Sequence, residues 1–158
     1  MYFIYVGDSK DVYSRLKTNH CNGNVEASAL RRYVAEAMGF KIKFEKRPSG
    51  STRARVDLPT PKQGEKAVSD YIRQGKWQIL ILDNYIIAHD FQWYVIEKLK
   101  PLLNRESQNY QIDKSELYEN LFERLTKSAL FDCNGINESF SGPGIYVLYH
   151  EQKPKLML

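Results

Sequence analysis

Apolar and polar residues alternate along this chain with two different periods, and the period distinguishes strands from helices. Side chains of period two at residues 2–6 predict a strand, and KIKFEK at 41–46 alternates like a short edge strand. WQILILD at 77–83 is a continuous apolar run of strand length, which is typical of a buried central strand. GPGIYVLYH at 142–150 predicts a further strand, entered through a glycine turn.

Helical spacing of apolar residues fills the chain between these strands. It predicts helices over about 10–18, 26–40, 62–74, 86–104 and from Asp113 to about 130. Gly39 would end the second helix, Pro61 would open the third and Pro101 would end the fourth. Glu116, three residues after Asp113, suggests a capping box.

The stretch from 47 to 61 contains Pro, Gly and Ser and is expected to be a loop. Three or four strands and five helices indicate an α/β or α+β fold. At 158 residues we expect one domain over 1–158, long enough to bury a core without a disulfide or a structural metal.

Composition adds expectations about the setting of the protein. Cys21 and Cys133 match neither a zinc spacing nor a disulfide framework, which favours a reduced, cytoplasmic location. No run of about 18 apolar residues is present, so no membrane span is predicted. The first ten residues lack the basic region of a signal peptide.

Positive charge is concentrated in the first third of the chain. Residues 1–55 hold 11 Lys and Arg against 5 Asp and Glu, a balance of +6, whereas the whole chain carries +4. A basic region of this kind is a pointer to a polyanion such as nucleic acid, although a solvated surface of uneven charge gives the same count.

Tyr5 and Arg15 are the first residues that suggest chemistry. A tyrosine at the end of a strand and an arginine inside the next helix can point into one cleft. The guanidinium offers a fixed fork of donors that suits a phosphate.

Four separate segments extend this observation to a family. YVGDSKDVYSRLKTNH resembles the second half of the GIY-YIG nuclease signature, and GIYVLYH resembles its first half. NVEASALRRYVAEAMGF is similar to the family's Ser-x-Leu-Arg helix, and VIEKLKPLLN is similar to its closing segment. The chain is therefore identified as a member of the GIY-YIG nuclease superfamily.

The resemblance implies a small, mainly antiparallel sheet flanked by helices, and a metal-dependent endonuclease site that cuts DNA. Its catalytic roles fall on Tyr146, Tyr5, Arg15 and Asn104, with Tyr146, or else Tyr5, activating a water. One Mg²⁺ or Mn²⁺ ion would be held by a glutamate twelve residues before the asparagine, and that position is Gln92.

Gln92 is the main departure from the family pattern. An amide keeps the size of the carboxylate and loses its charge, so it would hold Mg²⁺ poorly. Glu97 is the alternative carboxylate, and Asp90 and His89 lie near enough to assist. A second departure is that Asn19 takes the place of a family histidine or tyrosine, and His20, one residue later, is the candidate to replace it.

Basic side chains are expected to contact the phosphates of DNA. The candidates are Lys17, Arg31, Arg32, Arg47, Arg53 and Arg55.

The order of the two signature halves is reversed, since the GIY half lies at 144–146 and the YIG half at 5–7. Circular permutation is the favoured explanation, because joining residue 158 to residue 1 restores the family order. A strand exchanged between the protomers of a homodimer is the second alternative. The third is that the site is absent and the tripeptide is a coincidence.

Three functions remain open on this evidence. The first is a nuclease of the restriction, defence or repair type. The second is an inactive nucleic-acid-binding module on the same fold. The third is a structural or protein-interaction domain.

Overall fold

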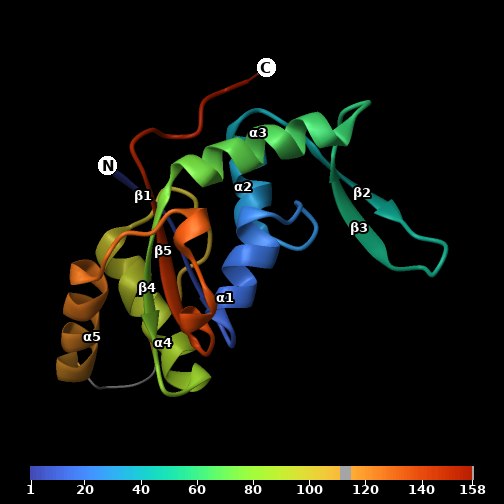
Figure 1. The fold of residues 1–158 in the computed structure, drawn as a ribbon. Helices are drawn as coiled ribbons and strands as arrows, with labels where there is room; N and C mark the ends of the chain where they lie inside the picture. The colour runs from blue at the N-terminus through green and yellow to red at the C-terminus, as the bar shows by residue number, and fades with distance from the viewer. Residues whose placement is uncertain (111–114, 158) are drawn as a thin grey trace.

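The computed structural model describes residues 1–110 and 115–157 as a mixed α+β protein with two small antiparallel sheets (Figure 1). The strands are β1 (Tyr2–Ser9), β2 (Ile42–Lys46), β3 (Thr52–Val56), β4 (Lys76–Ile81) and β5 (Gly144–His150). The α-helices are α1 (Val12–Ser14), α2 (Ala29–Ala37), α3 (Pro61–Gln74), α4 (Tyr85–Leu99) and α5 (Ser115–Lys127). A π-helix, η1 (Arg15–Cys21), follows α1, and two 3₁₀ turns, η2 (Cys133–Gly135) and η3 (Glu138–Phe140), precede β5.

The larger sheet has the order β1-β5-β4, and both of its strand pairs are antiparallel. The strand at the centre is therefore β5, and the expectation that 77–83 forms the central strand is wrong. The run at 77–83 is as apolar as a central strand because the outer edge of β4 is covered. There the backbone of Trp77 exchanges two hydrogen bonds with that of Phe131. Every residue of β5 is buried, as a strand flanked on both edges and both faces requires.

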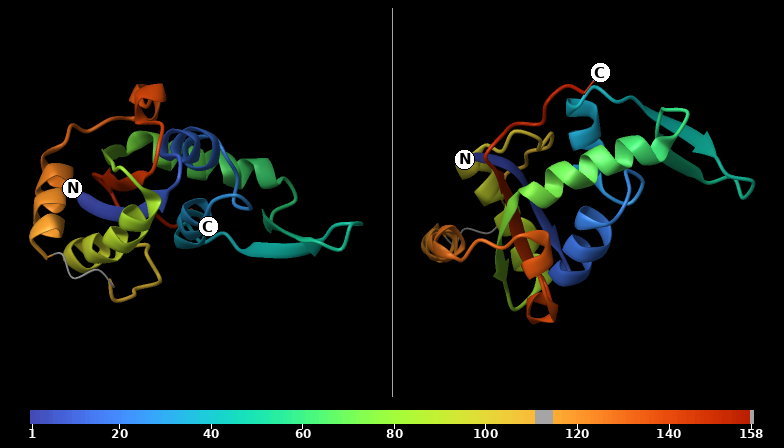
Figure 2. Two further views of the ribbon diagram at one scale, coloured as in Figure 1. Left: turned by 90° about the horizontal axis from the view of Figure 1, so that it is seen from below. Right: turned by 45° about the horizontal axis from the view of Figure 1, so that its top comes forward.

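Helices cover both faces of this sheet, and the alternation of β5 assigns its side chains to two cores. Ile145, Val147 and Tyr149 face α4 and α5. Tyr146 and Leu148 face the opposite side, where η1, α2 and α3 pack. Figure 2 shows the sheet between these two groups of helices. The predicted architecture, a small antiparallel sheet flanked by helices, is confirmed.

β2 and β3 form a separate hairpin that projects from the body beyond the N-terminal end of α3 (Figures 1 and 2). The sequence predicted a loop over 47–61, and that prediction is wrong for Thr52–Val56. The period of two is present there, because Ala54 and Val56 are buried while Arg55 is exposed. Of the Pro, Gly and Ser residues that suggested a loop, those at 48–51 make the turn between the strands, Pro59 lies in the short loop after β3, and Pro61 begins α3.

Helix ends differ from the predictions where side chains cap the backbone. α2 begins at Ala29, three residues later than predicted, because the Ser28 hydroxyl accepts a hydrogen bond from the Arg31 backbone N–H. The α4 helix ends at Leu99, since Lys100 takes a left-handed conformation with φ 48° directly before Pro101. The capping box predicted at Asp113 lies outside the described residues.

Cys21 and Cys133 are joined by a disulfide, so the prediction of no disulfide framework is wrong. Their separation of 112 residues gives no recognisable sequence spacing. The fold brings them together because the end of η1 packs against η2. None of the helices in the described part of the chain is long and apolar enough to cross a lipid bilayer.

Candidate functional site

Tyr146 lies at the centre of the sheet, and its ring rests on the backbone of Gly7. The β1–β5 register places these two residues opposite each other. A Cβ atom on residue 7 would lie 2.6 Å from the Tyr146 hydroxyl oxygen, so only glycine fits there. The glycine of the Tyr-Val-Gly strand therefore makes room for the tyrosine of the Gly-Ile-Tyr strand.

A buried histidine holds the hydroxyl of Tyr146. His20 Nε2 is hydrogen-bonded to the Tyr146 hydroxyl at 2.8 Å, and its Nδ1 to the Ser28 hydroxyl at 2.7 Å. The ring stacks parallel to Trp77, with centroids 6.1 Å apart. The structure thus brings His20 to Tyr146, as the sequence hypothesis required, and adds Ser28, which sequence reasoning had not selected.

His20 is neutral at physiological pH. Its burial, together with the positive charges of Arg15 and Arg31, holds the pKa of the imidazole well below its usual value. One ring nitrogen therefore donates and the other accepts. Because the Ser28 hydroxyl can do either, two tautomers satisfy the chain from Ser28 through His20 to Tyr146.

The two signature tyrosines both resist ionisation. Burial raises the pKa of Tyr5 to about 12 and raises that of Tyr146 still further. Arg15 opposes both shifts and interacts with the Tyr146 hydroxyl. Because both tyrosines stay protonated at neutral pH, their hydroxyls are better suited to donating hydrogen bonds than to removing a proton from a water.

A cleft of about 350 Å³ opens beside Tyr5 and is lined by Gln92 and Asn104 among others. Three of the residues assigned from the resemblance therefore meet in one cavity. Arg32 also lines it, while its guanidinium donates to the Val25 carbonyl. Glu97, the alternative carboxylate, lines a neighbouring cavity of about 1040 Å³ instead.

Asn104 pairs with the open edge of β1 much as another strand would. Its side-chain oxygen accepts from the Val6 N–H at 2.8 Å, and its side-chain N–H donates to the Val6 carbonyl at 2.9 Å. The backbone of Leu102 and Leu103 donates to the same edge. Asn104 therefore ties the end of α4 to β1 and fixes the cleft wall.

Gln92 contacts a pair that the sequence did not place together. Its amide nitrogen lies 3.1 Å from His89 Nδ1, which lies 2.7 Å from the Asp8 carboxylate. Asp8 was missed, although it directly follows the Tyr-Val-Gly strand. Asp90 lies on the other side of α4, where the Tyr118 hydroxyl donates to its carboxylate.

Two of the predicted phosphate contacts are engaged inside the protein. Arg31 is fully buried and forms an ion pair with Glu65 at 2.8 Å, so its guanidinium is not accessible to DNA. The Lys17 ammonium donates to the Cys133 carbonyl at 2.8 Å. We leave Arg31 out of the proposed interface for this reason.

The comparisons with known proteins decide the family. A family model described as the GIY-YIG catalytic domain matches residues 1–128. The chain belongs to the GIY-YIG catalytic domain family. No curated protein and no solved structure matches it. The GIY-YIG match ends before β5, so Tyr146 and the question of circular permutation lie outside it.

GIY-YIG nucleases generally use a divalent metal, and the donors present at the family position do not fit one. Gln92 offers a neutral amide where a hard cation favours a carboxylate. Nowhere in residues 1–110 and 115–157 does a group of three or more His, Cys, Asp or Glu side chains gather. No catalytic step is therefore assigned to a metal ion at Gln92.

The buried histidine predicts a pH dependence of stability. The pKa of His20 is lower in the folded than in the unfolded state, so unfolding takes up a proton below about pH 6.5. The free energy of unfolding should fall by up to about 1.4 kcal/mol per pH unit for this group as pH drops below 6.5. Urea unfolding at pH 7.5, 6.0 and 5.0 measures it.

His150 is the matched control, since burial also lowers the pKa of its imidazole. His20→Gln and His150→Gln should each remove only their own part of the acid sensitivity. An acid sensitivity unchanged in His20→Gln would show that His20 is not buried neutral.

Proposed function

We propose that this protein is a DNA endonuclease that hydrolyses phosphodiester bonds in the cleft beside Tyr5. The observation that carries the proposal is the placement of Tyr146 and Tyr5 on paired strands, with Arg15 interacting with the Tyr146 hydroxyl. Membership of the GIY-YIG family supports a nuclease in general. The DNA substrate, and a restriction, defence or repair setting, are parts of the proposal.

Each residue has a task in this mechanism. Water attacks the phosphorus, the bond from phosphorus to the departing sugar oxygen breaks, and the proton lost by the water passes through the solvent to that oxygen. Tyr5, which lines the cleft, orients the water through its hydroxyl, and the buried Tyr146, held by His20, positions Arg15. Arg15 stabilises the negative charge that builds on the phosphoryl oxygens, an effect that can supply several kcal/mol. Asn104 keeps β1 and the cleft wall in place.

Gln92 limits the rate at which this chain cleaves DNA. A divalent cation would offset the charge on the departing oxygen, but Gln92 offers it no charged ligand, and we propose that the chain therefore cuts slowly. The second candidate function, an inactive nucleic-acid-binding module, is favoured by this same residue together with the charge of the hairpin.

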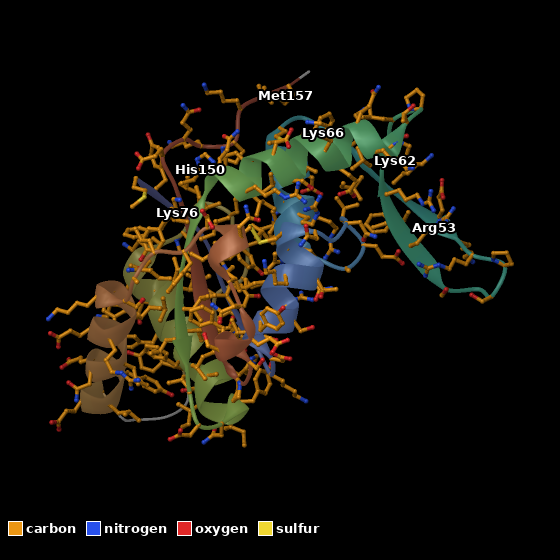
Figure 3. All side chains as sticks on the ribbon, viewed as in Figure 1. Arg53, Lys62, Lys66, Lys76, His150 and Met157 are labelled. Carbon is orange, nitrogen blue, oxygen red and sulfur yellow. A yellow bond between two sulfur atoms is a disulfide. The ribbon has the colours of Figure 1, made fainter. Side chains whose placement is uncertain are left out.

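The β2–β3 hairpin supports DNA binding in either case. Residues 41–56 carry 6 Lys and Arg against 1 Glu, a balance of +5. Arg53 and Arg55 share Glu45 on one face of the hairpin, and Figure 3 shows Arg53 on this projecting element. Exposed pairs of this kind are weak, so phosphates can compete for the guanidinium groups. Arg47, paired with Glu26, lies at the turn.

We also propose that the reversed order of the signature halves is a circular permutation. Tyr2 pairs with His150, so the end of β5 and the start of β1 are neighbours. A turn there would restore the family order without moving either strand. Because β1 and β5 pair within one chain, the site needs no strand from a second protomer.

Restoring the carboxylate tests the catalytic proposal. Gln92→Glu should raise Mg²⁺- or Mn²⁺-dependent nicking of supercoiled plasmid by about 100-fold or more, the range for one preorganised electrostatic group. Adding Tyr146→Phe to this variant should abolish the gain. Gln74→Glu, the same change at the exposed end of α3, is the control and should leave nicking unchanged.

If Gln92→Glu binds DNA and still fails to cut, the catalytic proposal is wrong and the binding module is the better description. If neither chain binds DNA nor cuts it, both proposals fail.

Removing charge from the hairpin tests the interface. The double variant Arg53→Ala, Arg55→Ala should weaken binding to duplex DNA and flatten the plot of log K against log salt by about 2, one unit per lost phosphate contact. Fluorescence anisotropy between 50 and 200 mM salt measures both. Arg124→Ala, Lys127→Ala removes two exposed charges from α5 and should leave the slope unchanged. An unchanged slope in the hairpin variant would remove the hairpin from the interface.

A further inference from the structure

The β2–β3 hairpin has two faces of different chemistry. Residues opposite each other in an antiparallel pair project to the same side, and neighbours along a strand project to opposite sides. Phe44 therefore lies on one face and Glu45 on the other. Lys43, Arg53 and Arg55 project to the same side as Glu45, and each forms an ion pair with it. The ion pairs within the hairpin thus lie on the face away from Phe44.

The face that carries Phe44 changes from buried to exposed along its length. Next to the body, Val56 is fully buried and Ala54 is only 8% exposed. Toward the turn, the Phe44 ring is 69% exposed, and Lys46 and Thr52 are exposed opposite each other. We call Phe44, Lys46 and Thr52 the outer face. It presents an aromatic ring, an ammonium group and a hydroxyl group to the solvent.

The dimensions of the hairpin fit the major groove of duplex DNA. Its two strands lie about 4.8 Å apart, and five residues in each give it a length of about 17 Å. The major groove is about 12 Å wide and admits a two-stranded ribbon, whereas the minor groove, about 6 Å wide, is too narrow for one. Because the hairpin projects from the body, it can enter a groove without a collision between the helices and the duplex (Figures 1 and 2).

The outer face has the chemistry that base edges in this groove require. A phenyl ring packs against the C5-methyl group of thymine, an ammonium donates to the guanine acceptors, and a threonine hydroxyl pairs with donors or acceptors. The charge of +5 over residues 41–56 is complementary to DNA and favours it over a protein as the partner of this face. Arg53 and Arg55 start from the opposite face, and their long side chains can reach the phosphates along the groove.

We propose that the β2–β3 hairpin reads DNA sequence in the major groove through Phe44, Lys46 and Thr52. Phe44 contacts a thymine methyl group, and Lys46 and Thr52 form hydrogen bonds with the base edges beside it. The inference rests on the proposed function for its substrate, duplex DNA, and adds the residues that select where the chain binds. Phosphate contacts position the hairpin, and the outer face specifies the site.

Selection from a library of randomised duplexes, without divalent metal, tests whether the hairpin reads sequence. The unmodified chain should enrich a motif that contains thymine. Replacing this thymine by uracil removes only the methyl group and should weaken binding about 10-fold, as Phe44→Ala should. In Phe44→Ala the same replacement should have no further effect, because the side chain that contacts the methyl group is gone.

The salt dependence of binding to the selected duplex separates this contact from a phosphate contact. Phe44→Ala should weaken binding at every salt concentration and leave the slope of log K against log salt unchanged, because an apolar contact releases no counterions. Phe44→Leu keeps an apolar side chain and should retain most of the affinity. Leu156→Ala removes a side chain that is 76% exposed near the C-terminus and should bind like the unmodified chain.

Circular dichroism shows whether each variant is folded, and Phe44→Leu and the uracil duplex give readings that do not depend on deleting a large side chain. The inference is overturned if no motif is enriched, or if uracil weakens binding equally in Phe44→Ala and in the unmodified chain. It is also overturned if sedimentation shows that Phe44→Ala separates a dimer while DNA binding is unchanged, since the outer face would then join two copies of the chain.

The proposed function can fail separately from this inference. A motif that depends on Phe44, without plasmid cleavage by Gln92→Glu, would uphold the inference and contradict the endonuclease proposal. Cleavage by Gln92→Glu with no motif that depends on Phe44 would do the reverse.

Discussion

The pairing register of β1 and β5 is the constraint on which the rest of the site depends. It sets Gly7 opposite Tyr146, and the absence of a side chain at Gly7 is what allows the phenol to lie across β1. A shift by one residue would reverse the face of every side chain on β5, sending Tyr146 toward α4 and Val147 toward η1. The same register holds Tyr5 at the cleft and carries Asp8 to His89. One strand pair thus positions the buried tyrosine, the cleft tyrosine and the Asp8 carboxylate beside His89.

Much of the fold was predictable, because the signals for it are local. Periodicity placed β1, β5, α3 and α4 close to their observed positions, and the resemblance named Tyr5, Gln92 and Asn104, which the structure gathers in one cleft. What failed depends on tertiary contacts. β4 is an edge strand whose outer edge Phe131 covers, and no periodicity reports that cover. The disulfide joins residues 112 apart, and only the packed chain brings them together.

The site residues that sequence reasoning missed share one property, which is that each acts through another side chain. Ser28 reads as a helix cap, and its contact with His20 is invisible until η1 and α2 are folded together. Asp8 reads as a turn residue until α4 brings His89 to it. Arg31 shows the opposite error. It was predicted to contact DNA because it lies in a basic segment, but its side chain is buried against Glu65. Charge in a sequence does not say which arginine faces solvent.

The central claim is that the site depends on the β1–β5 pair and not on the order of its strands in the chain. The most direct measurement uses a reordered chain in which residues 129–158 are followed by residues 1–128, carrying Gln92→Glu. We expect it to unfold in urea within about 1 kcal/mol of the unpermuted variant, because the residues after His150 become a loop between strand ends that are already neighbours, with loss of one hydrogen bond from the Met157 N–H to the Met38 carbonyl. We also expect it to nick plasmid as that variant does. A reordered chain that is folded and inactive, or that does not fold, while the unpermuted variant cuts, would contradict the account.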